Sequence, residues 1–400
     1  MFLYNIIKVL YSPIKAFQEI LGNPKFKGPV LIIIISLLLT LGTHYISASK
    51  HYVEQITPSN RVAWTNMSDP SSMWTSNGNI STLQATYEIL TGNYTVRTLV
   101  SNGTEIWLKT TNIETINCSG NSGFKTFYYK LLYIHMSSLN ASTATLRLFS
   151  LKNESNYFEF DLLSFPGRYI NKSISWIDAN ITVGESASGW VQSPGGSPSW
   201  ANITGIEFFL KFAESSKPLS LQLNDLYFGG KYTTYLDVLF SDWLALTIIM
   251  STFDFFIKWL ILAGLLWLTV KVFHAEGSTF KTLLVIVGYT FAIMLVYVPI
   301  EIISVSQLSP IYFPYKVVFP MTAREIELAG IATSNIYAAN WSSTAPYSVF
   351  IATWYISYAW TAALCTIALK ILHNFSWKRA SIISIVAIIM ALFVRAMVPL

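Results

Sequence analysis

The sequence predicts a membrane protein that combines a five-helix transmembrane bundle with an all-β, jelly-roll-like sandwich outside the cell. Of its 400 residues, 52% are hydrophobic and only 12% are charged, about half the charged share of a typical soluble domain. Five apolar runs are each close to the ~20 residues that a helix needs to cross a bilayer. Residues 48–238 are instead rich in Ser, Thr and Asn. With only two cysteines, neither a disulfide framework nor a cysteine-based zinc site is expected.

The apolar runs divide the chain into six predicted segments. The spans are predicted from Val30–Ile46, Phe255–Phe273, Leu283–Ile303, Tyr347–Ile371 and Ala380–Leu400. The segments are a cytoplasmic N-terminal part (1–27), the first span (28–47), the β domain (48–238), spans two and three (239–305), an extracellular loop (306–345), and spans four and five (346–400). Leu239–Phe253 is also apolar, and it either lengthens span two or lies in the membrane interface.

The N-terminal part contains the signals of a short amphipathic helix. Ser12 is a candidate cap, Pro13 fits the first turn and Gly22 fits the end. The helix lies either on the cytoplasmic membrane surface or against the protein's own membrane helices. Small residues at Ser47–Ser49 leave signal cleavage of span one open, although an uncleaved anchor is preferred.

The basic residues predict the orientation of the spans. The β domain holds 13 Lys/Arg against 14 Asp/Glu, a net of −1, whereas the remaining residues hold 13 against 7, a net of +6. The excess therefore belongs to the membrane part and gives no indication of nucleic-acid binding. Cytoplasmic loops carry the excess of Lys and Arg, so the N-terminus is predicted inside, and the β domain and C-terminus outside. The residues on which this depends are Lys8, Lys15, Lys25, Lys27, Lys271, Lys281, Lys370, Lys378 and Arg379.

Asn-x-Ser/Thr acceptors are unusually dense in the β domain. Ten of its 16 asparagines are acceptors, which indicates an N-glycosylated surface. Accidental matches in a Ser/Thr-rich surface are the alternative. Asn374 is predicted on the cytoplasmic side and unmodified. The predicted sites are Asn66, Asn79, Asn93, Asn102, Asn117, Asn140, Asn153, Asn171, Asn180 and Asn202 in the domain, with Asn340 in the later loop.

Two sets of short motifs resemble the Yip-domain membrane proteins of prokaryotes, in particular archaea. The N-terminal set is Tyr11-Ser12-Pro13, Phe17, Ile20 and Asn23-Pro24, and the second is Gly277-Ser278-Thr279-Phe280, Gly288-Tyr289 and Pro299. The resemblance covers roughly residues 5–46 and 250–400 and implies five spans with a cytoplasmic N-terminus. Eukaryotic members of the family are linked to Rab-type GTPases and vesicle traffic. The large insert after the first span departs from their compact pattern.

Alternating apolar and polar residues predict antiparallel strands in the β domain. Clear examples are 144–148, 206–212 and 219–223. The stretches Trp200–Ile206 and Asn224–Phe228 are similar to the last strands of carbohydrate-binding jelly-roll modules, which implies contact with glycans. Tryptophans that stack on sugars are candidates for this role, although core packing is the simpler interpretation. They are Trp64, Trp74, Trp107, Trp176, Trp190 and Trp200.

Other candidate residues in the domain favour structural roles. Glu159 and Asp161 share a strand face, but a glycosidase sets its two carboxylates across a cleft, so a solvated face is the preferred interpretation. His51 and His135 have no partner at metal-ligand spacing. Cys118 is unpaired and lies within the acceptor that begins at Asn117.

Ionisable residues within membrane spans are costly and therefore informative. Asp254 and Lys258 are four residues apart and can pair on one helix face. Glu301 and Arg395 are predicted at a similar depth, towards the outer leaflet. We interpret the four as an intramembrane polar cluster, which is either a ligand pocket or ion path, or a structural clamp.

These observations favour a non-enzymatic protein of the plasma membrane and cell envelope, without cofactor or metal. Its bundle would associate with lipid and with further copies of itself. Its glycosylated β domain would contact a surface glycan, an envelope layer or a partner protein. A transporter or permease subunit whose outer domain captures a solute is the main alternative. An envelope enzyme is a third, but it requires a nucleophile–base pair or clustered acids that the sequence does not contain.

The predicted orientation can be tested by glycopeptide mapping of the protein from its native membrane. We expect sugar on several acceptors between Asn66 and Asn202 and none on Asn374, because only the outer side meets the glycosylation machinery. Sugar on Asn374 with a bare β domain would reverse the orientation.

Overall fold

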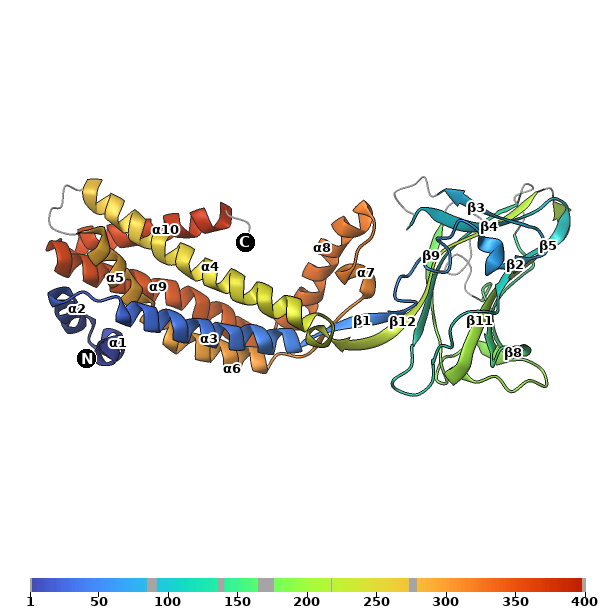
Figure 1. Ribbon diagram of the computed structural model, residues 1–400, viewed down its shortest axis with the longest axis horizontal. Coiled ribbons are helices and arrows are strands. Elements are labelled where there is room, and N and C mark those ends of the chain that lie inside the picture. Colours follow the sequence, from blue (N-terminus) through green and yellow to red (C-terminus); the bar gives the residue numbers. More distant parts are fainter. Residues whose placement is uncertain are drawn as a thin grey trace. The chain divides into compact units, whose positions relative to one another are not determined.

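The chain folds as two compact units (Figure 1). The computed structural model describes residues 2–84, 92–135, 140–164, 176–216, 218–272 and 279–397. The helical unit comprises Met1–Tyr52, Thr234–Ile311 and Ile336–Leu400. The β unit comprises Val53–Thr233 and Tyr312–Asn335, so part of the predicted loop between spans three and four folds with the β strands.

Long apolar helices dominate the helical unit. Four of them are long and apolar enough to cross a membrane, and they cover Lys27–Ser49, Trp243–Val272, Phe280–Ser306 and Ala345–His373. The fifth predicted span corresponds to α10, whose side chains beyond Phe393 fall outside the described residues. Five spans thus remain a prediction. The helices are α1 (Phe2–Tyr11), α2 (Pro13–Gly22), α3 (Lys27–Ser49), α4 (Tyr235–Val272), α5 (Phe280–Thr290), α6 (Met294–Ser306), α9 (Ala345–His373) and α10 (Trp377–Met397).

The structure settles two points that the sequence left open, the start of α4 and the packing of the N-terminal segment. The apolar stretch before span two lengthens the helix, because α4 runs without interruption from Tyr235 to Val272. A first helix, α1, precedes the predicted α2. Ser12 makes no side-chain hydrogen bond as a cap, so that detail of the prediction was wrong. Phe17 and Ile20 of α2 are buried in the core of the helical unit together with Val9 of α1, so this segment packs on the protein's own helices.

Small residues let α3 and α5 approach closely. A Cβ added to Gly28 would lie 2.0 Å from the hydroxyl oxygen of Tyr289, and one added to Gly288 would lie 2.5 Å from the Cβ of Pro29. Glycine at these positions therefore sets the distance between the two helices, as is usual where membrane helices pack without a hydrophobic driving force. Gly264 in α4 has no atom within 4 Å of such a Cβ.

The β unit contains a sandwich of two antiparallel sheets, which confirms the predicted fold class of the domain. One sheet has seven strands, in the order β13-β1-β12-β4-β3, with β6 between β12 and β9. The other has six strands, in the order β10-β8-β7-β11-β5-β2. The strands are β1 (His51–Thr57), β2 (Thr75–Ser76), β3 (Asn79–Gln84), β4 (Tyr94–Val100), β5 (Gly103–Thr110), β6 (Thr126–His135), β7 (Thr143–Ser150), β8 (Asn153–Asp161), β9 (Ile177–Thr182), β10 (Trp190–Gln192), β11 (Ile203–Ser216), β12 (Leu219–Thr234) and β13 (Ile311–Phe313).

Aromatic and branched side chains from both sheets fill the space between them. Phe127 of β6 lies with its ring centroid 4.8 Å from that of Phe228 and 6.4 Å from that of Phe208. All three are fully buried. The predicted strands at 144–148, 206–212 and 219–223 lie in β7, β11 and β12, and their alternation directs one set of side chains into this core.

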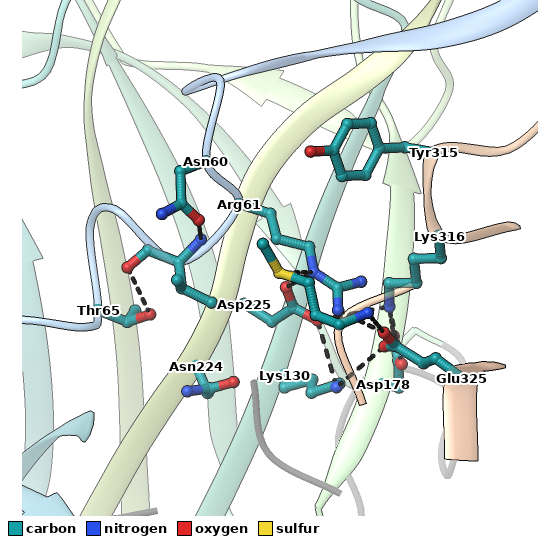
Figure 2. Close-up of polar contacts among 12 residues, drawn as sticks. Asn60, Arg61, Thr65, Lys130, Asp178, Asn224, Asp225, Tyr315, Lys316 and Glu325 are labelled. Atoms are coloured by element: carbon teal, nitrogen blue, oxygen red, sulfur yellow. Dashed lines mark hydrogen bonds and ion pairs between the residues drawn. The ribbon is translucent and has the colours of Figure 1, made fainter. Parts of the chain in front are cut away.

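Helices α7 (Tyr315–Val318) and α8 (Ala323–Tyr337), which the sequence did not predict, are held to the seven-stranded sheet by an ion cluster. We use this name for Arg61, Lys130, Asp178, Asp225, Lys316 and Glu325, which Figure 2 shows together. Asp225 lies at the centre: its carboxylate is 3.1 Å from Nε of Arg61, 3.2 Å from Nζ of Lys130 and 3.6 Å from Nζ of Lys316.

A break in β12 positions Asp225. Its φ is +57°, and the pairing register of β12 with β6 shifts between Asn224 and Tyr227. A bulge of this kind re-aims a side chain, and Asp tolerates the left-handed conformation better than most residues. The Asp225 carboxylate is thus directed to a site where its side chain is only 1% exposed.

Glu325 completes the cluster from α8. Its carboxylate accepts a hydrogen bond from Nη2 of Arg61 at 2.5 Å and another from the backbone N–H of Met321 at 2.9 Å. Burial opposes ionisation, but these two hydrogen bonds outweigh it and lower the pKa of Glu325 below its usual value. Burial likewise disfavours the charge on Arg61, yet Asp225 and Glu325 together raise the pKa of Arg61. Both shifts favour the charged forms of Arg61 and Glu325.

The close approach of α3 and α5 predicts a large effect of a single methyl group. Gly288→Ala should lower the stability of the helical unit by about 1–3 kcal/mol, because the Pro29 ring cannot move aside without repacking. Thermal unfolding followed by circular dichroism in detergent would measure it. Gly264→Ala is the matched control, and it should be neutral or slightly stabilising, since Ala favours a helix. Equal melting temperatures for the two variants would contradict the packing described.

Removal of the central carboxylate should release α7 and α8. Asp225→Ala leaves Arg61, Lys130 and Lys316 without their shared partner, and breaking a buried ion cluster in this way costs about 3–5 kcal/mol. Trypsin cleavage after Arg324 under native conditions should become much faster, because it reports local opening. The control is Glu185→Ala at an exposed position, which should leave the cleavage rate unchanged. Unchanged cleavage in Asp225→Ala would show that other contacts hold this segment.

Candidate functional site

The helical unit contains a partly open cavity of about 310 Å³, which is lined by most of the predicted polar cluster. Residues from α3, α4, α6, α9 and α10 line it. Its volume is at the lower end of the ~300–1,000 Å³ of ligand pockets. Asp254, Lys258 and Glu301, which the sequence assigned to one cluster, all lie on its wall. The side chain of Arg395 falls outside the described residues, so its place in the cluster remains a prediction.

The charged groups that line the cavity differ in the ion pairs and hydrogen bonds that they form. Asp254 and Lys258 form the predicted ion pair along one face of α4. Glu301 in α6 is only 9% exposed, and within the described part of the chain its carboxyl group has neither a hydrogen bond nor an ion pair. Lys258 is the cation whose charge acts on Glu301.

Hydroxyl groups on α9 also line the cavity, but their hydrogens are already used. Ser357 donates to the backbone carbonyl of Trp354 at 2.7 Å, and Thr361 donates to that of Ser357 at 2.8 Å. This back-bonding is usual for Ser and Thr in helices. These oxygens can therefore act towards a ligand as acceptors.

A second candidate site is a charged row across the solvent-side face of the six-stranded sheet. Arg147 in β7 bonds to Glu159 in β8 at 2.6 Å and to Glu207 in β11 at 3.2 Å. On the next strand, Lys109 bonds to Glu154 at 2.9 Å. Glu159, Arg147, Glu207 and Lys109 pair in register across β8, β7, β11 and β5. These four side chains form the row, and Glu154 of β8 joins it through its bond to Lys109. Burial raises the pKa of Glu207 above its usual value, although Arg147 and Lys109 oppose the shift.

Aromatic side chains flank the charged row. Trp107 is half-buried beside Lys109, whose Nζ lies 5.6 Å from the ring centroid. Tyr157 is half-buried under Arg147, whose Cζ lies 4.9 Å from the ring centroid. Cation–π contacts of this kind hold rings in place at a surface. The sequence pointed to Trp107 but missed the charged row, although the alternation of its members with core residues was visible.

The other tryptophans named as sugar-stacking candidates are mostly structural. Trp64, Trp74 and Trp200 are buried in the sandwich core, where the ring of Trp200 stacks on Phe158 at 3.8 Å. Trp190 is half-buried and packs against this core, and Trp176 is half-buried before β9. Core packing is therefore the better interpretation for three of the six.

The remaining candidates in the β domain have structural partners. Glu159 is part of the charged row, and the carboxylate of Asp161 accepts the backbone N–H of Leu163 at 2.8 Å. His51 lies 3.0 Å from the hydroxyl of Tyr337, and burial lowers its pKa to about 4. The thiol of Cys118 is buried, which raises its pKa to about 12. The side chain of His135 falls outside the described residues. Where side chains are described, no three His, Cys, Asp or Glu residues are arranged to hold a metal ion.

Most of the predicted glycosylation acceptors are at the surface. Asn66 and Asn202 are half-buried and Asn171 lies outside the described residues, whereas the other eight are exposed. At Asn117 the amide oxygen accepts hydrogen bonds from both the backbone N–H and the hydroxyl of Ser119, each at 2.8 Å. The exposed acceptors are Asn79, Asn93, Asn102, Asn117, Asn140, Asn153, Asn180 and Asn340.

Comparison with protein families connects the helical unit to a known membrane domain. Residues 216–397 match the family model of the Yip1 domain, a range that covers α4 to α10. This match and the several apolar helices together support a multi-pass membrane protein. The N-terminal motifs of the resemblance lie outside the matched range. No curated protein sequence matches the chain.

Solved structures similar to part of the chain include proteins that act on or bind polysaccharides. An exo-β-agarase matches with a TM-score of 0.30 and 7% sequence identity. The match covers 42% of this chain and 24% of the agarase chain. A family 11 carbohydrate-binding module from Clostridium thermocellum, solved with a β-1,3-1,4-mixed-linked tetrasaccharide, has a TM-score of 0.26 and 11% identity and covers 39% and 87%. A family 28 module specific for non-crystalline cellulose has a TM-score of 0.26 and 9% identity and covers 44% and 97%.

Proposed function

We propose that this protein is a non-enzymatic, multi-pass membrane protein whose β unit binds neutral glycans at the cell surface. The observation that carries the proposal is the charged row of Lys109, Glu154, Glu207, Arg147 and Glu159 with Trp107 and Tyr157 beside it. Fixed carboxylates accept hydrogen bonds from sugar hydroxyls, and half-exposed aromatic rings supply the flat apolar contact. Trp, Tyr and Arg are also the residues that most often dominate binding energy.

The charge of the row favours neutral sugars over acidic ones. Three carboxylates and two cations leave a net of −1, so an acidic glycan would meet repulsion from Glu154 and Glu159. Salt bridges hold these charged side chains in place before a ligand binds. Less conformational entropy of the side chains is therefore lost on binding.

The basic residues support an orientation with the β unit outside. Lys271, Lys281 and Lys370 lie near the ends of α4, α5 and α9, which meet at one end of the helical unit (Figure 1). Cations concentrate on the cytoplasmic side of membrane proteins. This orientation leaves the N-terminus cytoplasmic, exposes the acceptor asparagines to glycosylation and places the charged row where a surface glycan, or a glycan of the envelope layer, can reach it.

The proposal predicts selective binding on an array of neutral and acidic oligosaccharides. The full-length protein in nanodiscs should bind neutral members, and Trp107→Ala or Tyr157→Ala should weaken that binding about tenfold, which corresponds to about 1.4 kcal/mol. Trp176→Ala removes a half-buried tryptophan outside the row and serves as the matched control.

Two results would contradict the proposal. One is an absence of binding to any neutral glycan by the folded, full-length protein. The other is an equal loss of binding in all three variants, because that loss would come from general destabilisation of the β unit. The full chain is required, since residues 312–335 are part of that unit.

A further inference from the structure

A hollow of about 290 Å³ lies in the helical unit, where α2 packs beside the turn that joins α9 to α10. It shares no lining residue with the cavity described above. Parts of the chain that are far apart in sequence meet here and combine polar with apolar side chains. The described residues that line the hollow are Ile14 and Gln18 of α2, Lys370 and Ile371 of α9, Asn374 of the turn and Trp377 of α10.

Lys370 gives the hollow a positive charge, because it is the one ionisable side chain among the described residues that line it. Two contacts hold its ammonium group in place. Nζ donates to the backbone carbonyl of Phe375 at 3.2 Å and lies 5.2 Å from the ring centroid of Trp377. An ammonium group has three N–H donors, so it can also donate to a ligand. The amides of Gln18 and Asn374 add neutral donors, and the hollow therefore fits an anion with several acceptor oxygens, such as a phosphate.

The position of the hollow indicates that this anion belongs to a lipid. Helix α9 is long and apolar enough to cross a membrane, and it ends at His373. The hollow therefore lies at the level where a span meets the lipid head groups. Trp377 is 50% exposed and Ile14 is 46% exposed, and tryptophan is enriched at this level of membrane proteins. A phospholipid places apolar chains against such side chains next to its phosphate, whereas a free anion gains nothing from them.

We propose that this hollow binds the head-group phosphate of an anionic phospholipid, with Lys370 as the cation and the apolar lining against the lipid chains. Lys15 and Lys378 are exposed, and each is next in sequence to a lining residue, so they add positive charge nearby. Glu19, the acidic residue of α2, forms an ion pair with Lys8. Basic pockets between membrane helices bind anionic head groups in this way. The proposal is independent of glycan binding by the β unit.

Native mass spectrometry of the full-length protein in detergent tests the proposal. Phosphatidylglycerol should form a saturable adduct and bind at least about fivefold more tightly than phosphatidylcholine, whose choline cancels the charge of the phosphate. Lys370→Gln should weaken the binding of phosphatidylglycerol about fivefold, which is the effect of one lysine near an anionic lipid surface. Lys25→Gln makes the same change of charge at an exposed position before α3 and outside the hollow. It should leave the affinity unchanged.

Two further measurements separate lipid binding from other roles of the same residues. Inorganic phosphate at the concentration of the lipid should not displace phosphatidylglycerol, because it lacks the apolar chains. Gln18→Leu removes a neutral donor at an exposed position and should weaken the binding about threefold, the effect of one hydrogen bond. If Lys370 serves only to cap α9 through the carbonyl of Phe375, Lys370→Gln will lower the melting temperature and leave the preference for phosphatidylglycerol unchanged.

Four outcomes would overturn the proposal. They are equal affinity of the unmodified protein for phosphatidylglycerol and phosphatidylcholine, equal loss of binding in Lys370→Gln and Lys25→Gln, an unchanged lipid preference in folded Lys370→Gln, and displacement of the lipid by inorganic phosphate. If Lys370→Gln does not fold, Gln18→Leu decides the question, because its exposed side chain is not needed for the core. Unchanged affinity for phosphatidylglycerol in that variant would then contradict binding at the hollow.

Discussion

The ion pair between Arg61 and Asp225 is the constraint on which the architecture of the β unit depends. Both side chains are at most 1% exposed, and a charge so deeply buried is tolerated only when its partners are in place. Lys130 of the sheet and Lys316 of α7 also form ion pairs with Asp225, and Glu325 of α8 forms one with Arg61. Segments far apart in sequence must therefore assemble together, since the absence of any one leaves a buried charge behind.

The helical unit is held together mainly by apolar packing, whereas the β unit depends on ion pairs. Its packing relies on small residues, such as Gly28 and Gly288, and on a continuous apolar core. Lys258 and Asp254 form an ion pair on the wall of the cavity, and Glu301 lies on the same wall. The ion cluster of the β unit is complete in itself and specifies a structure.

The sequence predicted elements wherever a local pattern carried the information. Apolar length located the four long apolar helices. Period-two alternation located β7, β11 and β12, and a spacing of four residues indicated the ion pair of Asp254 with Lys258. Non-local features were not predictable, because no local signal marks them. Nothing near Arg61 in sequence indicates Asp225 or Glu325, and helices α7 and α8 are too polar and too short to stand out. Glu301 lies on the same cavity wall as the Asp254–Lys258 pair, as the predicted cluster required.

The segment 312–335 has a consequence for how such a protein could arise or be re-engineered. The chain passes between the units four times, after Tyr52, Thr233, Ile311 and Asn335. A domain inserted at one loop can be moved as a single stretch, but this β unit is encoded in two separated pieces. Transplanting it to another membrane scaffold would require both pieces to be moved, and all four connections to be replaced, at once. A change of scaffold would therefore have to preserve two separate insertions, not one.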